Sequence, residues 1–137
     1  MPHQDPITVA EAATREFWEK FFNEGDMNAF NRFAASGYQE NGTPGADGSG
    51  LKKWIEGVRA RYDLQVTIDE LLGAEMPAQL PGADGPAQVV TVSLSWTATG
   101  TPKESGESPF RTKGMNVLFF RGDRVVVNSH ALEVVGS

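Results

Sequence analysis

The stretch GMNVLFFRGDRVVVNSHALEV, residues 114–134, is typical of two long apolar β-strands joined by a tight Gly-Asp turn. The second strand carries Asn128, His130 and Glu133 where a buried strand usually carries valine or isoleucine. A buried polar side chain without a partner costs about 1–3 kcal/mol, and a buried charge costs more. We therefore expect one or two of these side chains to face the interior or a pocket, and we look for the function in this hairpin.

Composition limits the possible classes of protein. The chain has 137 residues, of which 39% are hydrophobic and 9% aromatic, so we expect one globular domain over residues 1–137. The formal net charge is −6, and the 12 Lys and Arg residues are scattered along the chain. Binding to the phosphate backbone of a nucleic acid is therefore not expected.

The chain contains no cysteine and two histidines, His3 and His130. A disulfide framework, a thiolate nucleophile and a histidine-rich zinc site are therefore excluded, and we expect neither a metal nor another cofactor. The N-terminus lacks a basic start and an apolar run, and no segment approaches the length of a transmembrane helix. We expect a soluble cytoplasmic protein that does not bind membranes.

The first half of the chain has helical periodicity. Residues 1–7 form a polar lead that we expect to be frayed. Thr8 and Glu11 have capping-box spacing and predict the start of a first amphipathic helix that runs to about residue 23. Asp26 is expected to cap a short second helix that extends up to Gly37, and Ser49 to cap a third.

After the third helix the period of the apolar residues changes from 3.6 to 2, which predicts strands. Before the third helix we expect a short strand at 38–41 and a glycine-rich loop over the mouth of a cavity. After it we expect four strands in an antiparallel meander. The four strands are expected at 64–74, 88–101, 110–121 and 124–135. This order predicts an α+β fold, and the strands that are apolar on both faces predict a homodimer.

Three segments resemble the SnoaL-like polyketide cyclases of the nuclear transport factor 2-like superfamily. They are YQENGTPGADG, SLSWTATGTP at 93–102, and RGDRVVVNSHALE at 121–133. The resemblance covers nearly the whole chain, and the middle segment is the most specific. It implies a cone-shaped α+β barrel in which three N-terminal helices pack on a curved antiparallel sheet. It also implies a cofactor-independent cyclase or isomerase that closes a ring, for example by an aldol-type reaction, in an apolar cavity.

The sequence departs from the family pattern at several positions. Pro102 stands in place of a histidine, and Val127, Asn128 and Ser129 replace a glutamate-histidine-tryptophan triplet, while the family's terminal acid aligns with Glu133. Limonene epoxide hydrolase, a looser relative, places a pocket aspartate at the position of His130. Because the arginine and second aspartate of that enzyme fall near serines, its mechanism does not transfer to this chain.

Strand alternation places Arg124, Val126, Asn128 and His130 on one face, which corresponds to the cavity face in the family. His130 is our first candidate for a catalytic base, because histidine titrates near neutral pH and needs no metal to move a proton. Its alternative role is structural, with the ring hydrogen-bonded to a backbone carbonyl. Glu133 is a second candidate only if a bulge reverses the phase of the strand, and otherwise it is a solvated edge residue.

A second group of polar candidates lies in the predicted strand at 38–41. Tyr38 could bind an enolate oxygen, and Glu40 shares its face, while Asn41 begins the loop. Not all three can point inward, and for each the alternative is a solvated strand edge or loop. Asn116 and Asn128 are better placed, because amides within apolar strands need internal partners.

The remaining candidates are apolar side chains that could line a pocket for a flat ligand. They are Phe17, Phe21, Phe33, Trp54, Trp96 and Leu118. The alternative is that these residues simply pack the core. Two other functions stay open: a non-catalytic protein that binds an apolar small molecule, which predicts an apolar cavity with His130 turned outward, and a dimeric assembly module, which predicts a filled core.

Overall fold

The computed structural model describes residues 5–41 and 47–134, and only the backbone of residues 132–134. Its helices are α1 (Pro6–Phe17), the π-helical segment η1 (Trp18–Asn23) that continues it, α2 (Met27–Phe33) and α3 (Ser49–Arg61). Its strands are β1 (Ala34–Glu40), β2 (Tyr62–Ala78), β3 (Ala87–Pro102), β4 (Phe110–Arg121) and β5 (Arg124–Val134). In the described part of the chain, no helix is long and apolar enough to cross a membrane.

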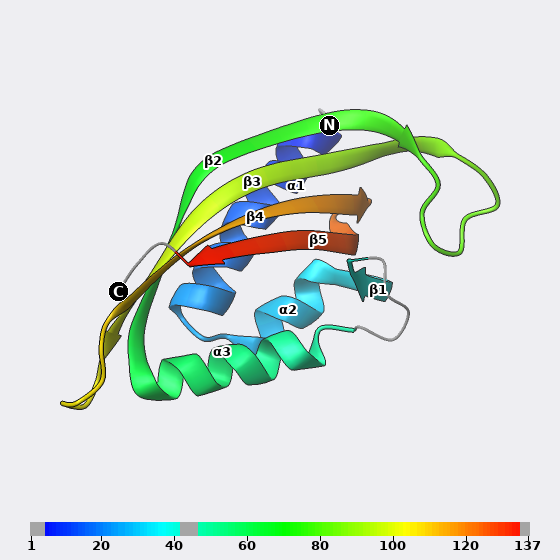
Figure 1. Ribbon diagram of the computed structural model, residues 1–137. Coiled ribbons are helices and arrows are strands. Elements are labelled where there is room, and N and C mark those ends of the chain that lie inside the picture. The colour runs from blue at the N-terminus through cyan, green and yellow to red at the C-terminus, as the bar shows by residue number, and fades with distance from the viewer. Residues whose placement is uncertain (1–4, 42–46, 135–137) are drawn as a thin grey trace.

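The strands form one curved sheet in the order β1-β5-β4-β3-β2, and the helices lie on its inner side (Figure 1). Strands β2 to β5 make the expected antiparallel meander, while β1 pairs in parallel with β5. The predicted α+β fold, with three helices on a curved sheet, is confirmed. The sheet is mixed and open, because β1 forms one edge and β2 the other.

An aspartate just before each α-helix accepts a hydrogen bond from a backbone N–H at the start of that helix. The prediction that Thr8 caps α1 was wrong: Asp5 is the cap and accepts a hydrogen bond from the Ile7 backbone N–H, with proline as the first helical residue. Asp26 caps α2 as expected, but α2 ends at Phe33 and not near Gly37. Before α3, Asp47 accepts from the Ser49 backbone N–H, so serine is the first helical residue and not the cap.

One end of the inner face is packed with aromatic rings. Phe17 stacks on Phe33 and Phe21, with ring centroids 4.2 and 4.9 Å apart, and Phe33 meets Phe120 of β4 edge to face. Leu118 of β4 is fully buried in the same cluster. Stacked and edge-on rings of this kind bury large apolar areas, so this end of the sheet is the hydrophobic core.

A bulge changes the phase of β5 near its start. Phe120 pairs with Val125 but Phe119 pairs with Val127, so Val126 is the extra residue. As a result, Val125 packs in the inner core and Val126 joins the outer cluster with Leu80. The predicted face of Val126 was therefore wrong, whereas the inward positions of Asn128 and, on β4, of Asn116, Leu118 and Phe120 are confirmed.

Candidate functional site

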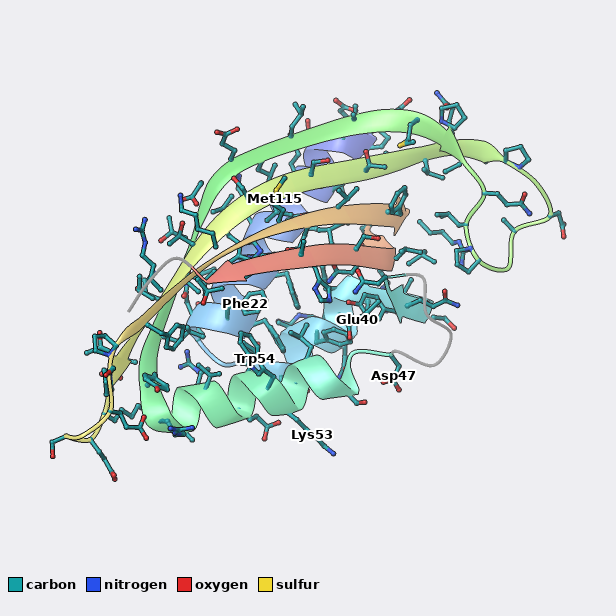
Figure 2. The ribbon with its side chains drawn as sticks, viewed as in Figure 1. Phe22, Glu40, Asp47, Lys53, Trp54 and Met115 are labelled. Carbon is teal, nitrogen blue, oxygen red and sulfur yellow. The ribbon has the colours of Figure 1, made fainter. Side chains whose placement is uncertain are left out.

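The other end of the inner face is open and forms a pocket of about 340 Å³. Its walls come from η1, β1, α3 and the three strands β3, β4 and β5. Figure 2 shows Phe22, Trp54 and Glu40 gathered in the space between α3 and the sheet, while Lys53 points away from it. The lining residues are Trp18, Phe22, Glu40, Gly50, Leu51, Trp54, Trp96, Asn116, Asn128 and His130.

A chain of hydrogen bonds crosses this wall from strand to strand. The Trp96 Nε1–H donates to Asn116 Oδ1 at 2.7 Å, and Asn116 Nδ2 donates to Asn128 Oδ1 at 2.7 Å. Asn128 Nδ2 then donates to the Tyr38 hydroxyl at 3.0 Å. Because an indole can only donate, Trp96 fixes which end of Asn116 faces it, and Asn116 in turn fixes the orientation of Asn128.

Gly114 makes room for the first donor of this chain. It pairs with Trp96 across the β3–β4 ladder, and the indole lies directly over it, so that a Cβ at this position would collide with the ring. Asn116 follows two residues later on the same face. The glycine thus lets the indole lie along β4 and bring its N–H to the Asn116 amide.

Tyr38 supports the pocket from behind. It is only 7% exposed, packs edge-on against Phe30, and is not among the residues that line the pocket. Burial, followed by the charge of Glu40, raises the pKa of the Tyr38 phenol well above its ordinary value, and the hydrogen bond from Asn128 lowers it only in part. Tyr38 therefore stays protonated and reaches the site through Asn128.

His130 and Glu40 face each other at the pocket wall. His130 Nε2 lies 3.8 Å from Glu40 Oε2, beyond hydrogen-bond reach but close enough for an ion pair when the imidazole is protonated. The side chains are 34% and 16% exposed, respectively. Burial raises the pKa of Glu40, His130 lowers it and Asp47 raises it, with a net upward shift. Glu40 therefore keeps its proton to a higher pH than an ordinary glutamate.

Asn41 holds the end of β1, which carries Glu40, next to the part of β5 that carries His130. Its Oδ1 accepts from the His130 backbone N–H at 2.9 Å, and its own N–H donates to the Asn128 carbonyl at 2.8 Å. Its φ of 52° lies in the left-handed region that asparagine tolerates. The candidate side chain of Asn41 thus uses its amide oxygen to hold the end of β1 against β5.

Solved structures of other proteins resemble this chain along nearly its whole length. A SnoaL-like polyketide cyclase from Agrobacterium tumefaciens is 13% identical, with a TM-score of 0.62 and coverage of 96% of this chain and 93% of that one. The chain has the SnoaL-like fold. A proposed polyketide cyclase from Acidithiobacillus ferrooxidans is 22% identical, with a TM-score of 0.62 and coverage of 97% and 92%.

A second kind of enzyme shares this SnoaL-like fold. An epoxide hydrolase of M. tuberculosis, similar to limonene epoxide hydrolase, is 14% identical, with a TM-score of 0.61 and coverage of 94% of this chain and 86% of that one. No protein-family profile matches the sequence, and no curated protein matches it. At these identities the likeness establishes the fold, and the chemistry has to be argued from the site.

The SnoaL-like fold brings together five of the residues selected from the sequence: His130, Asn128, Asn116, Trp96 and Trp54 all line the pocket. Four aromatic and aliphatic candidates do not line this pocket. Phe21 and Leu118 are fully buried in the core, and Phe17 and Phe33 border a separate hollow of about 350 Å³ beside Arg32. Glu133 pairs with Lys113 on β4, and its side chain lies outside the described part of the protein.

Sequence reasoning had named Glu40 only as a residue that shares the face of Tyr38, and it had not selected Phe22 or Leu51 for the site. Glu40 reaches His130 because β1 pairs in parallel with β5 and sets Glu40 beside Asn128. A parallel pairing between distant segments leaves no local signal in the sequence. Trp18 and Phe22 lie on η1, in a turn with a wider period than that of the predicted α-helix. Within the described residues, no cluster of three or more His, Asp or Glu side chains is placed to hold a metal ion.

Proposed function

We propose that this protein is a cofactor-independent cyclase or isomerase that acts on an apolar, polyketide-like small molecule. The observation that carries the proposal is the placement of His130 and Glu40 side by side on the wall of a pocket whose other lining residues are apolar or aromatic, apart from the two amides of Asn116 and Asn128. A base and a carboxyl group with a raised pKa in one pocket can divide proton removal and proton return between them. This arrangement suits enolisation, aldol-type ring closure and related isomerisations.

In this reaction His130 removes a proton from a carbon next to a carbonyl group, and Glu40 in its protonated form returns a proton elsewhere on the same molecule. The rings of Trp18, Trp54 and Phe22 hold the flat ligand and exclude water. Asn116 and Asn128 supply hydrogen bonds to its oxygen. Among the described residues that line the pocket there is no lysine or arginine, which favours a ligand without a carboxylate.

The two alternative functions receive less support. A passive carrier of apolar molecules needs no ionisable pair in the pocket, whereas His130 lines the pocket beside Glu40. An assembly module would fill the space with side chains, whereas a pocket of about 340 Å³ stands open.

The proposal is tested with 2-tetralone, a flat two-ring ketone. Its carbonyl group makes the hydrogens on the neighbouring carbons acidic. The measurement is the rate at which its α-hydrogens exchange for deuterium in D₂O, followed by NMR. This rate measures proton removal by the catalytic base and does not require the natural substrate. We expect the protein to accelerate this exchange, and H130A to lose about 10²–10⁴-fold of the acceleration, the usual contribution of a general base.

The matched control is S129A, because Ser129 neighbours His130 on the opposite face of β5. It should exchange 2-tetralone at the wild-type rate, and the circular dichroism of both variants should match that of the wild type. Exchange that persists in H130A would make the histidine structural. Binding of 2-tetralone with no accelerated exchange in the wild type would favour the non-catalytic alternative.

We also propose that two copies of the chain associate through the outer face of the sheet. Leu72 and Met115 are 68% and 65% exposed on that face. A second copy of the chain that covers this face would remove these apolar side chains from water. Sedimentation equilibrium should give twice the monomer mass, and a monomer at high protein concentration would contradict the proposal.

A further inference from the structure

The direction of the hydrogen-bond chain leaves two donors unused at the pocket wall. A side-chain amide has two N–H groups and one oxygen. Asn116 Nδ2 and Asn128 Nδ2 each donate one hydrogen bond among the described residues, to Asn128 and Tyr38 respectively. One N–H of each amide therefore remains, and both residues line the pocket.

These amides lie next to the proposed base. Asn116 on β4 is the cross-strand partner of His130, and Asn128 precedes His130 by two residues on the same face of β5. Directly paired residues have Cβ atoms about 4.5–5.5 Å apart. A ligand oxygen held by the amides would therefore place its neighbouring carbon within reach of the imidazole.

We propose that the free N–H groups of Asn116 and Asn128 form a binding site for the oxyanion of an enolate, and that Trp96 is the positioning residue that aims them. The inference rests on the proposed function and specifies its substrate as a ketone or ester that enolises. The C–H bond next to the carbonyl breaks, and His130 takes the proton. The electron pair forms a C=C bond while the carbonyl π pair moves to the oxygen, where the two N–H groups stabilise the negative charge.

Trp96 matters because an asparagine amide can rotate by half a turn at little cost and present its oxygen in place of its nitrogen. The indole N–H prevents this for Asn116, since reversal would set two donors against each other, and Asn116 then prevents it for Asn128. Without the indole N–H, both amides can turn their oxygens toward the ligand. An oxygen in that position repels an oxyanion.

The test uses 2-naphthol, whose ionised form has the shape and charge of the enolate of 2-tetralone, and 2-methylnaphthalene as the hydrocarbon control. The ultraviolet absorption of bound 2-naphthol, followed against pH, gives its acid dissociation constant in the pocket. We expect this constant to exceed that of free 2-naphthol by about tenfold or more, the effect of hydrogen bonds to a charged oxygen. In W96F we expect it to fall to within about threefold of the free value, while 2-methylnaphthalene still binds.

The matched control is S95A, because Ser95 neighbours Trp96 on the opposite face of β3 and does not line the pocket. It should keep the elevated dissociation constant of 2-naphthol. N116L removes one donor outright and should reproduce the loss if W96F does not fold. A dissociation constant equal to that of the free probe in the wild type, or one that W96F and N116L leave unchanged, would overturn the inference even if H130A stops exchange of 2-tetralone. If the wild type binds neither probe, the proposed function fails and the inference fails with it.

Discussion

The two ends of the sheet's inner face are built from the same strands and differ in what covers them. At one end Leu118 and Phe120 of β4 are buried against the rings of α1 and α2. Two residues earlier on the same face, Asn116 faces a pocket of about 340 Å³. The strand continues without interruption, so the change from core to pocket comes from the helices.

The covering helices explain this change. At the closed end the stacked rings of Phe17 and Phe33 fill the space against the sheet. At the open end α3 stands off from the sheet, and Trp54 at its inner side is still 47% exposed. Polar side chains are retained at the open end because the amides and the indole satisfy one another across the strands.

The largest expected effect comes from the closed end. L118A removes a fully buried side chain from a packed cluster, so it should lower the free energy of unfolding by about 2–5 kcal/mol, measured by urea denaturation. R111A changes an exposed side chain of the same strand and should stay within about 0.5 kcal/mol of the wild type. Equal losses in the two variants would mean that the closed end is not the core.

A smaller but more specific effect is expected at the open end. G114A places a methyl group against the Trp96 ring, so the indole must move and lose its hydrogen bond to Asn116. Overpacking of this kind costs about 1–3 kcal/mol in the free energy of unfolding. The Asn116 side-chain amide signals should also shift in the NMR spectrum. Unchanged amide signals would show that the indole does not set the orientation of this amide.

Residues with a local signal could be predicted from the sequence. The alternation in β4 placed Asn116 and Leu118 on one face, and the Gly-Asp turn predicted a hairpin between the last two strands, as the structure confirms. The helix starts were harder, because Thr8 and Asp5 both offer a capping oxygen and the following proline decides between them.

Features that depend on distant contacts could not be predicted in the same way. The bulge at Val126 reverses the phase of the residues before it relative to those after it, without any local break in the apolar pattern of the strand. Glu40 joins His130 only through the parallel pairing of β1 with β5. Which end of the face is closed depends on where the helices dock, so Phe17 and Trp54 could not be assigned to core and pocket from their periodicity alone.

The smallest effect concerns Glu40, and its size depends on pH. Its pKa is raised in the folded protein, chiefly by burial, so the folded state binds the proton more tightly than the unfolded state. The stability that this provides is present below the ordinary glutamate pKa of about 4.3 and is lost as the pH rises through the raised value. E40Q carries no titrating group at this position. It should therefore gain stability relative to the wild type across that interval and hold a constant difference above it.

Urea midpoints of the wild type and E40Q, measured at a series of pH values from about 4 to 8, decide between two forces on the same carboxyl group. If burial dominates, E40Q gains stability as the pH rises, and a protonated Glu40 remains available as an acid above the range of ordinary glutamates. If attraction to protonated His130 dominates, E40Q instead loses stability as Glu40 ionises, because the variant lacks the ion pair across the 3.8 Å gap. That second outcome would assign Glu40 the role of orienting and charging His130, and the returning proton would then have to come from the imidazolium itself.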